Sequence, residues 1–135
     1  MERPAGPSRL KVLIMDDEEM IRSLAMEIFT ALGHEPHTTS DGAAALAAYA
    51  EAMTRGTPFD LVIMDLTIPG GMGGREAVDK ILAMDPTARV VVASGYSNDP
   101  VMAHYRDHGF VAMLVKPFRI VDLEKIIAEI FVVSP

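Results

Sequence analysis

The chain has no cysteine, so it carries neither a disulfide framework nor a thiolate metal site. This fits a reducing compartment without requiring one, and we expect a cytoplasmic protein. The chain also lacks any apolar run near the ~20 residues that span a bilayer. Residues 1–8 are polar and contain proline, which is not the pattern of a signal peptide. We therefore predict no contact with a membrane.

Basic residues are scarce. The chain has 12 Lys and Arg against 19 Asp and Glu, and its net charge is −7 at pH 7. This balance argues against nucleic-acid binding by the chain alone, because phosphate backbones attract cationic surfaces. It suits a solvated acidic surface and a cation site.

The length of 135 residues predicts one domain, large enough to bury a core. Residues 1–9 contain two prolines and a glycine without apolar periodicity, so we predict a disordered lead-in or linker remnant there. The domain itself is expected over residues 10–133. Ten methionines are interpreted as core filling.

Strands and helices alternate along the sequence. Apolar periodicity and turn residues predict five strands, at 10–15, 35–39, 59–65, 88–93 and 110–115. They predict five helices, at about 21–32, 43–54, 74–84, 100–108 and 123–130. Such alternation implies an α/β fold with right-handed crossovers and a parallel sheet covered on both faces. Ligands of such sheets bind at the carboxyl ends of the strands.

One short stretch, 59–69, stands out. A buried apolar strand ends on a single acid, Asp65, and four glycines follow within residues 70–74. A carboxylate that ends a buried strand before a flexible loop is ill suited to a core and well suited to a site.

Polar residues follow the other central strands as well. They are Asp16 and Asp17 after the first strand, Ser94 after the fourth and Lys116 after the fifth. Taken singly, such an acid is often a helix N-cap and such a lysine is usually solvated. Because the carboxyl ends of parallel strands share one edge of the sheet, we expect all of these side chains to meet Asp65.

Three carboxylates at one edge repel one another unless a cation intervenes. Oxygen ligands of this kind suit Mg²⁺. With a lysine and a hydroxyl nearby, the arrangement is typical of phosphoryl transfer, in which Asp65 attacks phosphorus and forms an acyl phosphate. Lys116 would offset charge on the phosphoryl oxygens, and Ser94 would donate a hydrogen bond to one of them.

The set Asp16-Asp17, Asp65 with Pro69, Ser94 and Lys116-Pro117 resembles the receiver domain of two-component response regulators over residues 10–133. The resemblance implies a flavodoxin-like, doubly wound (βα)5 sandwich of three layers with sheet order 2-1-3-4-5. It implies that Asp65 is the phosphoacceptor for a kinase phosphohistidine.

The same resemblance implies that Asp17 binds Mg²⁺ directly and that Asp16 binds it mainly through water. The backbone carbonyl of Thr67 would be a further ligand. Ser94 and Lys116 would hold the phosphoryl oxygens. It also implies a cis bond between Lys116 and Pro117. The implied partner is a histidine kinase or a phosphotransfer domain. A homodimer through the face formed by the fourth helix, fifth strand and fifth helix is a further expectation.

Two stretches, 65–74 and 94–100, also resemble receivers fused to the C-terminal end of hybrid sensor histidine kinases. The proline-containing lead-in fits a piece of such a protein and fits a stand-alone receiver equally well.

The sequence departs from the receiver pattern at Met113, where an aromatic residue usually stands three positions before the lysine. That aromatic normally moves inward on phosphorylation, so the switch would be weak or would be carried by Tyr96 or Tyr105. Met113 as plain packing is the competing interpretation. Tyr96 and Thr67 are expected to restrict the attacking water and so to set the lifetime of the acyl phosphate.

His104 and His108 stand four residues apart on a predicted helix and could share a metal. No third ligand is evident, so a surface pair is the preferred interpretation.

Three other functions compete. A phosphatase of the haloacid dehalogenase type needs an acid two residues after Asp65, where Thr67 stands, and a cap domain. A flavin carrier needs a phosphate-binding loop in place of Asp16-Asp17. An interaction module that works without phosphorylation is the main alternative, and Met113 leaves room for it.

Overall fold

A computed structural model describes residues 9–131 of the chain. Residues 1–8, which hold nearly all of the predicted lead-in, and residues 132–135 lie outside the described part. Within residues 9–131, no helix is both long and apolar enough to cross a membrane.

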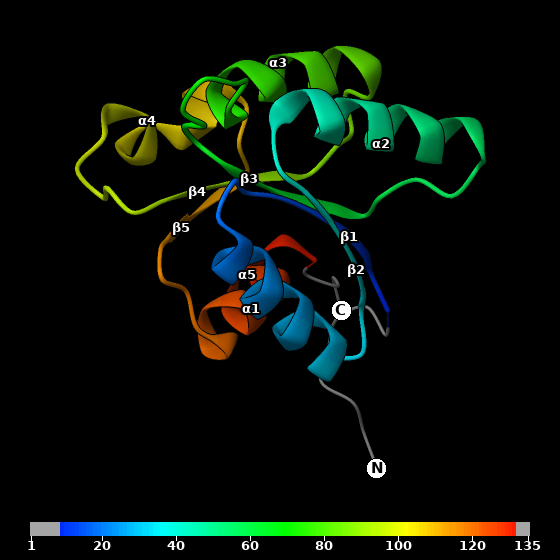
Figure 1. The fold of residues 1–135 in the computed structure, drawn as a ribbon, viewed down its shortest axis with the longest axis horizontal. Coiled ribbons are helices and arrows are strands. Elements are labelled where there is room, and N and C mark those ends of the chain that lie inside the picture. The colour runs from blue at the N-terminus through cyan, green and yellow to red at the C-terminus, as the bar shows by residue number, and fades with distance from the viewer. Residues whose placement is uncertain (1–8, 132–135) are drawn as a thin grey trace.

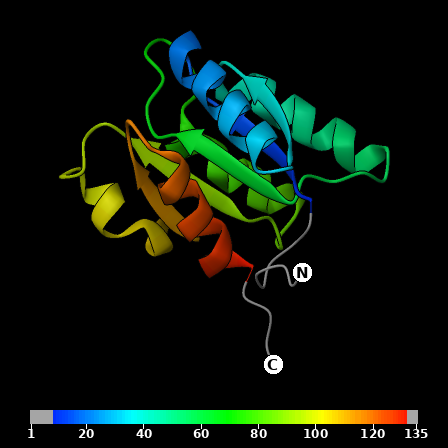
Figure 2. The same cartoon turned by 90° about the horizontal axis from the view of Figure 1, so that it is seen from below.

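Five parallel strands form one sheet in the order β2-β1-β3-β4-β5, as expected. They are β1 (Lys11–Met15), β2 (Glu35–Thr39), β3 (Leu61–Asp65), β4 (Val90–Ser94) and β5 (Ala112–Val115). The order places β3 at the centre and β2 at one edge (Figures 1 and 2). The carboxyl ends of β1, β3, β4 and β5 therefore share one edge of the sheet.

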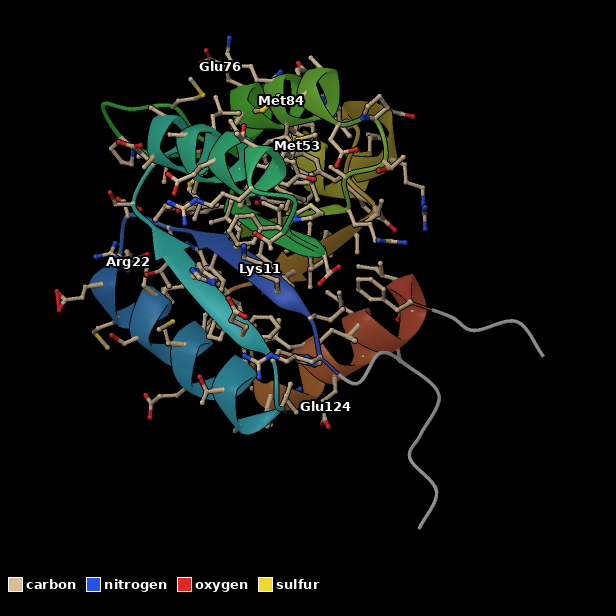
Figure 3. All side chains as sticks on the ribbon, turned by 90° about the vertical axis from the view of Figure 1, so that its right-hand side faces the viewer. Lys11, Arg22, Met53, Glu76, Met84 and Glu124 are labelled. Atoms are coloured by element: carbon tan, nitrogen blue, oxygen red, sulfur yellow. The ribbon has the colours of Figure 1, made fainter. Side chains whose placement is uncertain are left out.

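Helices cover both faces of the sheet and complete the three layers. In Figure 1, α1 (Glu19–Ala31) and α5 (Ile120–Ile130) lie below it. Above it lie α2 (Gly42–Thr54), α3 (Gly74–Met84), α4 (Pro100–Ala103) and a 3₁₀ turn, η1 (Tyr105–His108). In Figure 3, where β2 passes in front of β1, side chains fill both spaces between helices and sheet.

Strand alternation divides the core into two halves. Successive side chains of a strand point to opposite faces. Leu13 and Met64 accordingly pack in the cluster under α2 and α3, whereas Ile14 and Ile63 pack in the cluster over α1 and α5. Strands β3 and β4 are buried at every residue, which explains their continuous apolar sequences. Strand β2 is half-buried, as suits an edge.

The prediction of one continuous helix over residues 100–108 is wrong. Asp99 caps the helix start and Pro100 opens it, but α4 ends at Ala103. His104 leaves the helical region, with φ −122° and ψ 40°, and η1 follows as a separate tight turn. Gly109 then reverses the chain with φ +96°, and Phe110 enters the core. Phe110 is buried in the same cluster as Val78 and Ile81 of α3, and a nine-residue segment has only a weak preference of its own for one continuous helix.

Candidate functional site

A cleft of about 410 Å³ opens at the carboxyl edge of the sheet. Six of the predicted site residues line it: Asp17, Asp65, Thr67, Ser94, Tyr96 and Lys116. Asp16 is buried beside them and pairs with Lys116. The topology therefore brings together the chemistry that the sequence places at four separate strand ends.

Asp65 is the last residue of β3, and its position there explains its burial. β3 is paired on both sides, with β1 and β4, so its end lies in the middle of the edge. Asp65 is only 7% exposed. Burial, followed by the charge of Asp16, raises the pKa of Asp65 to about 6, although Lys116 works in the opposite direction.

Three carboxylates form the acidic part of the cleft. One oxygen from each of Asp16, Asp17 and Asp65 can lie within 4.8 Å of the others. Asp16 is already engaged on both oxygens: Oδ1 accepts from the Glu18 N–H at 2.9 Å, and Oδ2 pairs with Lys116. Asp17 is exposed, which leaves it open to an incoming cation.

Lys116 directly follows β5, and its ammonium group lies among three carboxylates. Its Nζ lies 2.9 Å from Asp16 Oδ2, 3.3 Å from Asp65 Oδ2 and 3.7 Å from Glu18 Oε1. The side chain is 10% exposed. Burial works to lower the pKa of Lys116, but the bond to Asp16 and the nearby charges outweigh it and raise that pKa overall. Lys116 is therefore a cation here, and the expected cis bond to Pro117 is present.

The charges fit a divalent cation. The three carboxylates carry −3 when ionised and Lys116 carries +1, which leaves −2 in a confined space. Oxygen ligands suit Mg²⁺ in preference to softer metals. Among residues 9–131, this trio is also the one group of three or more acidic or histidine side chains able to share an ion.

Ser94 and Tyr96 form the wall after β4. Ser94 is 4% exposed, and its Oγ accepts a hydrogen bond from the Tyr96 N–H at 3.0 Å. The hydroxyl therefore keeps its own proton for an acceptor inside the cleft. The Tyr96 side chain is 77% exposed and stands at the mouth.

Two glycines let the start of α3 approach β3 closely. A Cβ on Gly73 would lie 2.5 Å from the Leu66 carbonyl oxygen, and one on Gly74 would lie 2.9 Å from the Asp65 carbonyl oxygen. A larger residue at either position would push α3 away from the backbone of Asp65 and its neighbour. The glycines after Asp65 are thus needed for packing as well as for turning.

Met113 lies outside the cleft. It is half-buried in a separate hollow of about 480 Å³ between η1, β5 and α5, which Tyr105 also lines. That hollow carries no carboxylate trio. His104 and His108 are separated by the break after α4, so the helical spacing that could pair them on a metal is lost.

Sequence reasoning missed Glu18, which directly precedes α1 and reaches Lys116 from the cleft wall. It also missed Asp99, which lines the cleft while capping α4. The available indication for Glu18 was its place directly after Asp16-Asp17 at the same strand end.

A family model for the response regulator receiver domain matches residues 12–128. Sporulation initiation phosphotransferase F of Bacillus subtilis is 31% identical over 113 residues, covering 84% of this chain and 86% of that protein. Chemotaxis protein CheY of Thermotoga maritima is 31% identical over 110 residues, covering 81% and 87%.

Among solved structures, the chain resembles the CheX–CheY complex with BeF3 and magnesium from Borrelia burgdorferi. The TM-score is 0.82 and the identity 26%, with coverage of 92% of this chain and 90% of the other. CheY4 of Vibrio cholerae gives a TM-score of 0.80 at 26% identity, covering 91% and 99%. Since the family model matches most of the chain, and relatives above 30% identity cover more than four fifths of it, the chain belongs to the response regulator receiver domain family.

Proposed function

We propose that Asp65 is the phosphoacceptor of a two-component phosphorelay, loaded by Mg²⁺-dependent transfer from a kinase phosphohistidine. The observation that carries this proposal is the setting of Asp65: a buried carboxylate 3.3 Å from Lys116 Nζ and within reach of Asp16 and Asp17. The protein is then a signalling module that catalyses only its own phosphorylation and dephosphorylation.

In the proposed step, a carboxylate oxygen of Asp65 attacks the phosphorus. An O–P bond forms as the P–N bond to the donor imidazole breaks, and the electron pair of that bond stays on the nitrogen. Lys116 shifts from the carboxylates to offset the charge on the phosphoryl oxygens, and the Ser94 hydroxyl donates to one of them. Asp16, Asp17, Asp65 and the Thr67 carbonyl would hold the cation, which supplies further positive charge beside the phosphoryl oxygens when bound.

A phosphoryl group at Asp65 also adds charge and acceptor oxygens beside the loop that follows β4. Drawing Ser94 and Lys116 toward it would reposition that loop and α4, η1, β5 and α5. We propose this face as the surface that changes on phosphorylation, either for a partner or for a homodimer. The signal donor would be a histidine kinase or a phosphotransfer domain, and the location cytoplasmic.

An interaction module that works without phosphorylation stays the second candidate, because Met113 replaces the usual aromatic. A methionine is more flexible than an aromatic ring and specifies its position less strongly. This candidate requires that Asp65 be dispensable for binding to a partner.

A context in a hybrid sensor histidine kinase is a finer proposal. It rests on the resemblance of residues 65–74 and 94–100 alone, whereas the relatives compared above are close to this chain in length. Immunoblotting of the source cells separates the two contexts. A band near the 14.6 kDa of this chain indicates a stand-alone receiver, and a much larger band indicates a kinase.

Phosphorylation itself is tested with phosphoramidate, a small donor whose P–N bond mimics that of phosphohistidine. Intact-mass spectrometry should find one added phosphoryl group on the wild-type protein in Mg²⁺, and none on Asp65→Asn. Asp79→Asn, on the exposed side of α3, is the matched control and should label like wild type. Equal labelling of Asp65→Asn, or no labelling of wild type, would refute the phosphoacceptor role.

A further inference from the structure

Residues 67–72, between β3 and α3, bring Thr67 and Pro69 to the cleft. Within this segment the Gly71 N–H donates to the Ile68 carbonyl at 3.1 Å, which closes a turn. In the described part of the chain, one backbone hydrogen bond joins this segment to another element: the Gly42 N–H donates to the Met72 carbonyl at 2.7 Å. The first residue of α2 therefore holds the segment that carries the proposed Thr67 ligand.

The end of β2, just before α2, is bonded to the backbone at the end of β1. The Asp16 N–H donates to the Thr39 carbonyl at 3.1 Å, at the end of β2. Asp41 then caps α2 by accepting from the Ala44 N–H at 2.9 Å. The end of β2 and the start of α2 thus connect the backbone of Asp16 with residues 67–72, although neither contributes a side chain to the cleft lining.

Position 42 accepts no side chain. A Cβ on Gly42 would lie 2.7 Å from both the carbonyl oxygen and Cγ of Met72, and 2.9 Å from its Cβ. The backbone oxygen cannot move aside without moving the segment. Gly42 thus has the residue type that close approach to Met72 demands.

We propose that Gly42 is a positioning residue for the cation site: its N–H fixes the Met72 carbonyl and so sets where the Thr67 carbonyl stands. This inference rests on the proposed function, because it assumes that Asp65 and the Thr67 carbonyl hold Mg²⁺. Groups that orient a metal's ligands typically change its affinity by roughly 10–100-fold when they are removed.

The first test is hydrogen exchange on the wild-type protein, followed by NMR with and without Mg²⁺. Binding should order residues 67–72 and slow exchange of the Gly42 amide several-fold. The Gly56 amide, bonded to the Met53 carbonyl at the far end of α2, is the internal control and should not respond. Exchange at Gly42 that is unchanged by bound Mg²⁺ would overturn the proposal without any need for a variant.

The second test compares Mg²⁺ affinity by calorimetry. Gly42→Ala should weaken binding about tenfold, whereas Gly71→Ala, in the same segment with no atom closer than 3.3 Å to its Cβ, should bind like wild type. Wild-type affinity in Gly42→Ala would refute the positioning role while leaving the phosphoacceptor role intact. Absence of Mg²⁺ binding by wild type would instead remove the proposed function.

Discussion

Lys116 Nζ lies 2.9 Å from Asp16 Oδ2 across 100 residues of sequence, with both side chains nearly buried. The pair joins the end of β5 to the end of β1 over the cleft. It also leaves Asp65 as the second carboxylate in contact with the lysine, at 3.3 Å. A single ammonium therefore offsets the charge of two buried carboxylates, and in the proposed function it would turn to a phosphoryl oxygen.

Lys116→Met should lower stability while strengthening Mg²⁺ binding. Removing one partner of a buried pair leaves uncompensated carboxylates and costs about 3 kcal/mol in the free energy of unfolding. The same loss makes the site more negative, so a divalent cation should bind more tightly. Urea unfolding and calorimetry measure the two effects. Lys80→Met, on the exposed side of α3, is the control. Weaker Mg²⁺ binding by Lys116→Met would contradict the charge balance described here.

Asp65→Asn should stabilise the metal-free protein at neutral pH. The pKa of Asp65 is raised to about 6 in the folded state, against about 3.9 for an unfolded chain. The folded state therefore holds more protons between these values, and this group's contribution is complete below pH ~4 and lost as the pH rises through about 6. The variant should gain roughly 3 kcal/mol over wild type at pH 7.5 and little at pH 4. Urea unfolding across this range checks it. An equal difference at both pH values would show that the titration of Asp65 is not the cause.

Tyr49→Phe should destabilise the contact between α2 and α3. The Tyr49 hydroxyl donates to Asp85 Oδ2 at 2.7 Å, and this bond is the main reason that the pKa of Asp85 lies below its usual value. Losing it should cost about 1 kcal/mol at pH 7. Because the pKa of Asp85 is lower in the folded than in the unfolded state, the loss of stability is complete above the unfolded pKa. It fades as the pH falls through the folded pKa. Denaturant unfolding over a series of pH values from 7 downward is the measurement, with Tyr105→Phe as control. A cost that does not decline as the pH falls would argue for lost packing instead.

Tyr96→Ala should shorten the lifetime of the acyl phosphate. Tyr96 stands exposed at the mouth of the cleft, where we expect its ring to restrict the approach of water to a phosphoryl group on Asp65. We expect hydrolysis several-fold faster than in wild type, followed by loss of radiolabel after removal of the donor. Ser97→Ala, in the same exposed loop but outside the cleft lining, should hydrolyse at the wild-type rate. An unchanged rate in Tyr96→Ala would refute the shielding role.

The sequence predicts the central strands well because β3 and β4 are buried on both faces and are apolar throughout. It predicts the meeting of Asp65, Ser94 and Lys116 because strand ends of a parallel sheet share one edge. The strand order could not be predicted in the same way, because periodicity alone does not say which strands are neighbours. The prediction of the order rested on the resemblance to receivers.

Two features escaped the sequence for physical reasons. The helix breaks at His104, and Phe110 is buried just beyond Gly109. No proline or glycine lies between residues 101 and 108, so the local sequence gives no sign of the break. The bond from Gly42 to Met72 joins two backbone groups, so no side-chain pattern encodes it. The glycine at 42 is visible in the sequence, but its partner emerges only once α2 lies beside the segment after β3.

The most direct measurement is a titration with beryllofluoride, a phosphoryl mimic, in Mg²⁺, followed by amide NMR on wild type and Asp65→Asn. If Asp65 is a functional phosphoacceptor, the amide resonances of Asp17, Asp65, Ser94 and Lys116 should shift saturably in the wild-type protein. These chemical-shift changes should vanish in the variant. Spread of the shifts to α4, η1 and β5 would further show that the switch works with methionine at position 113. No response in the wild-type protein would contradict the phosphoacceptor role and leave the phosphorylation-independent interaction module as the function.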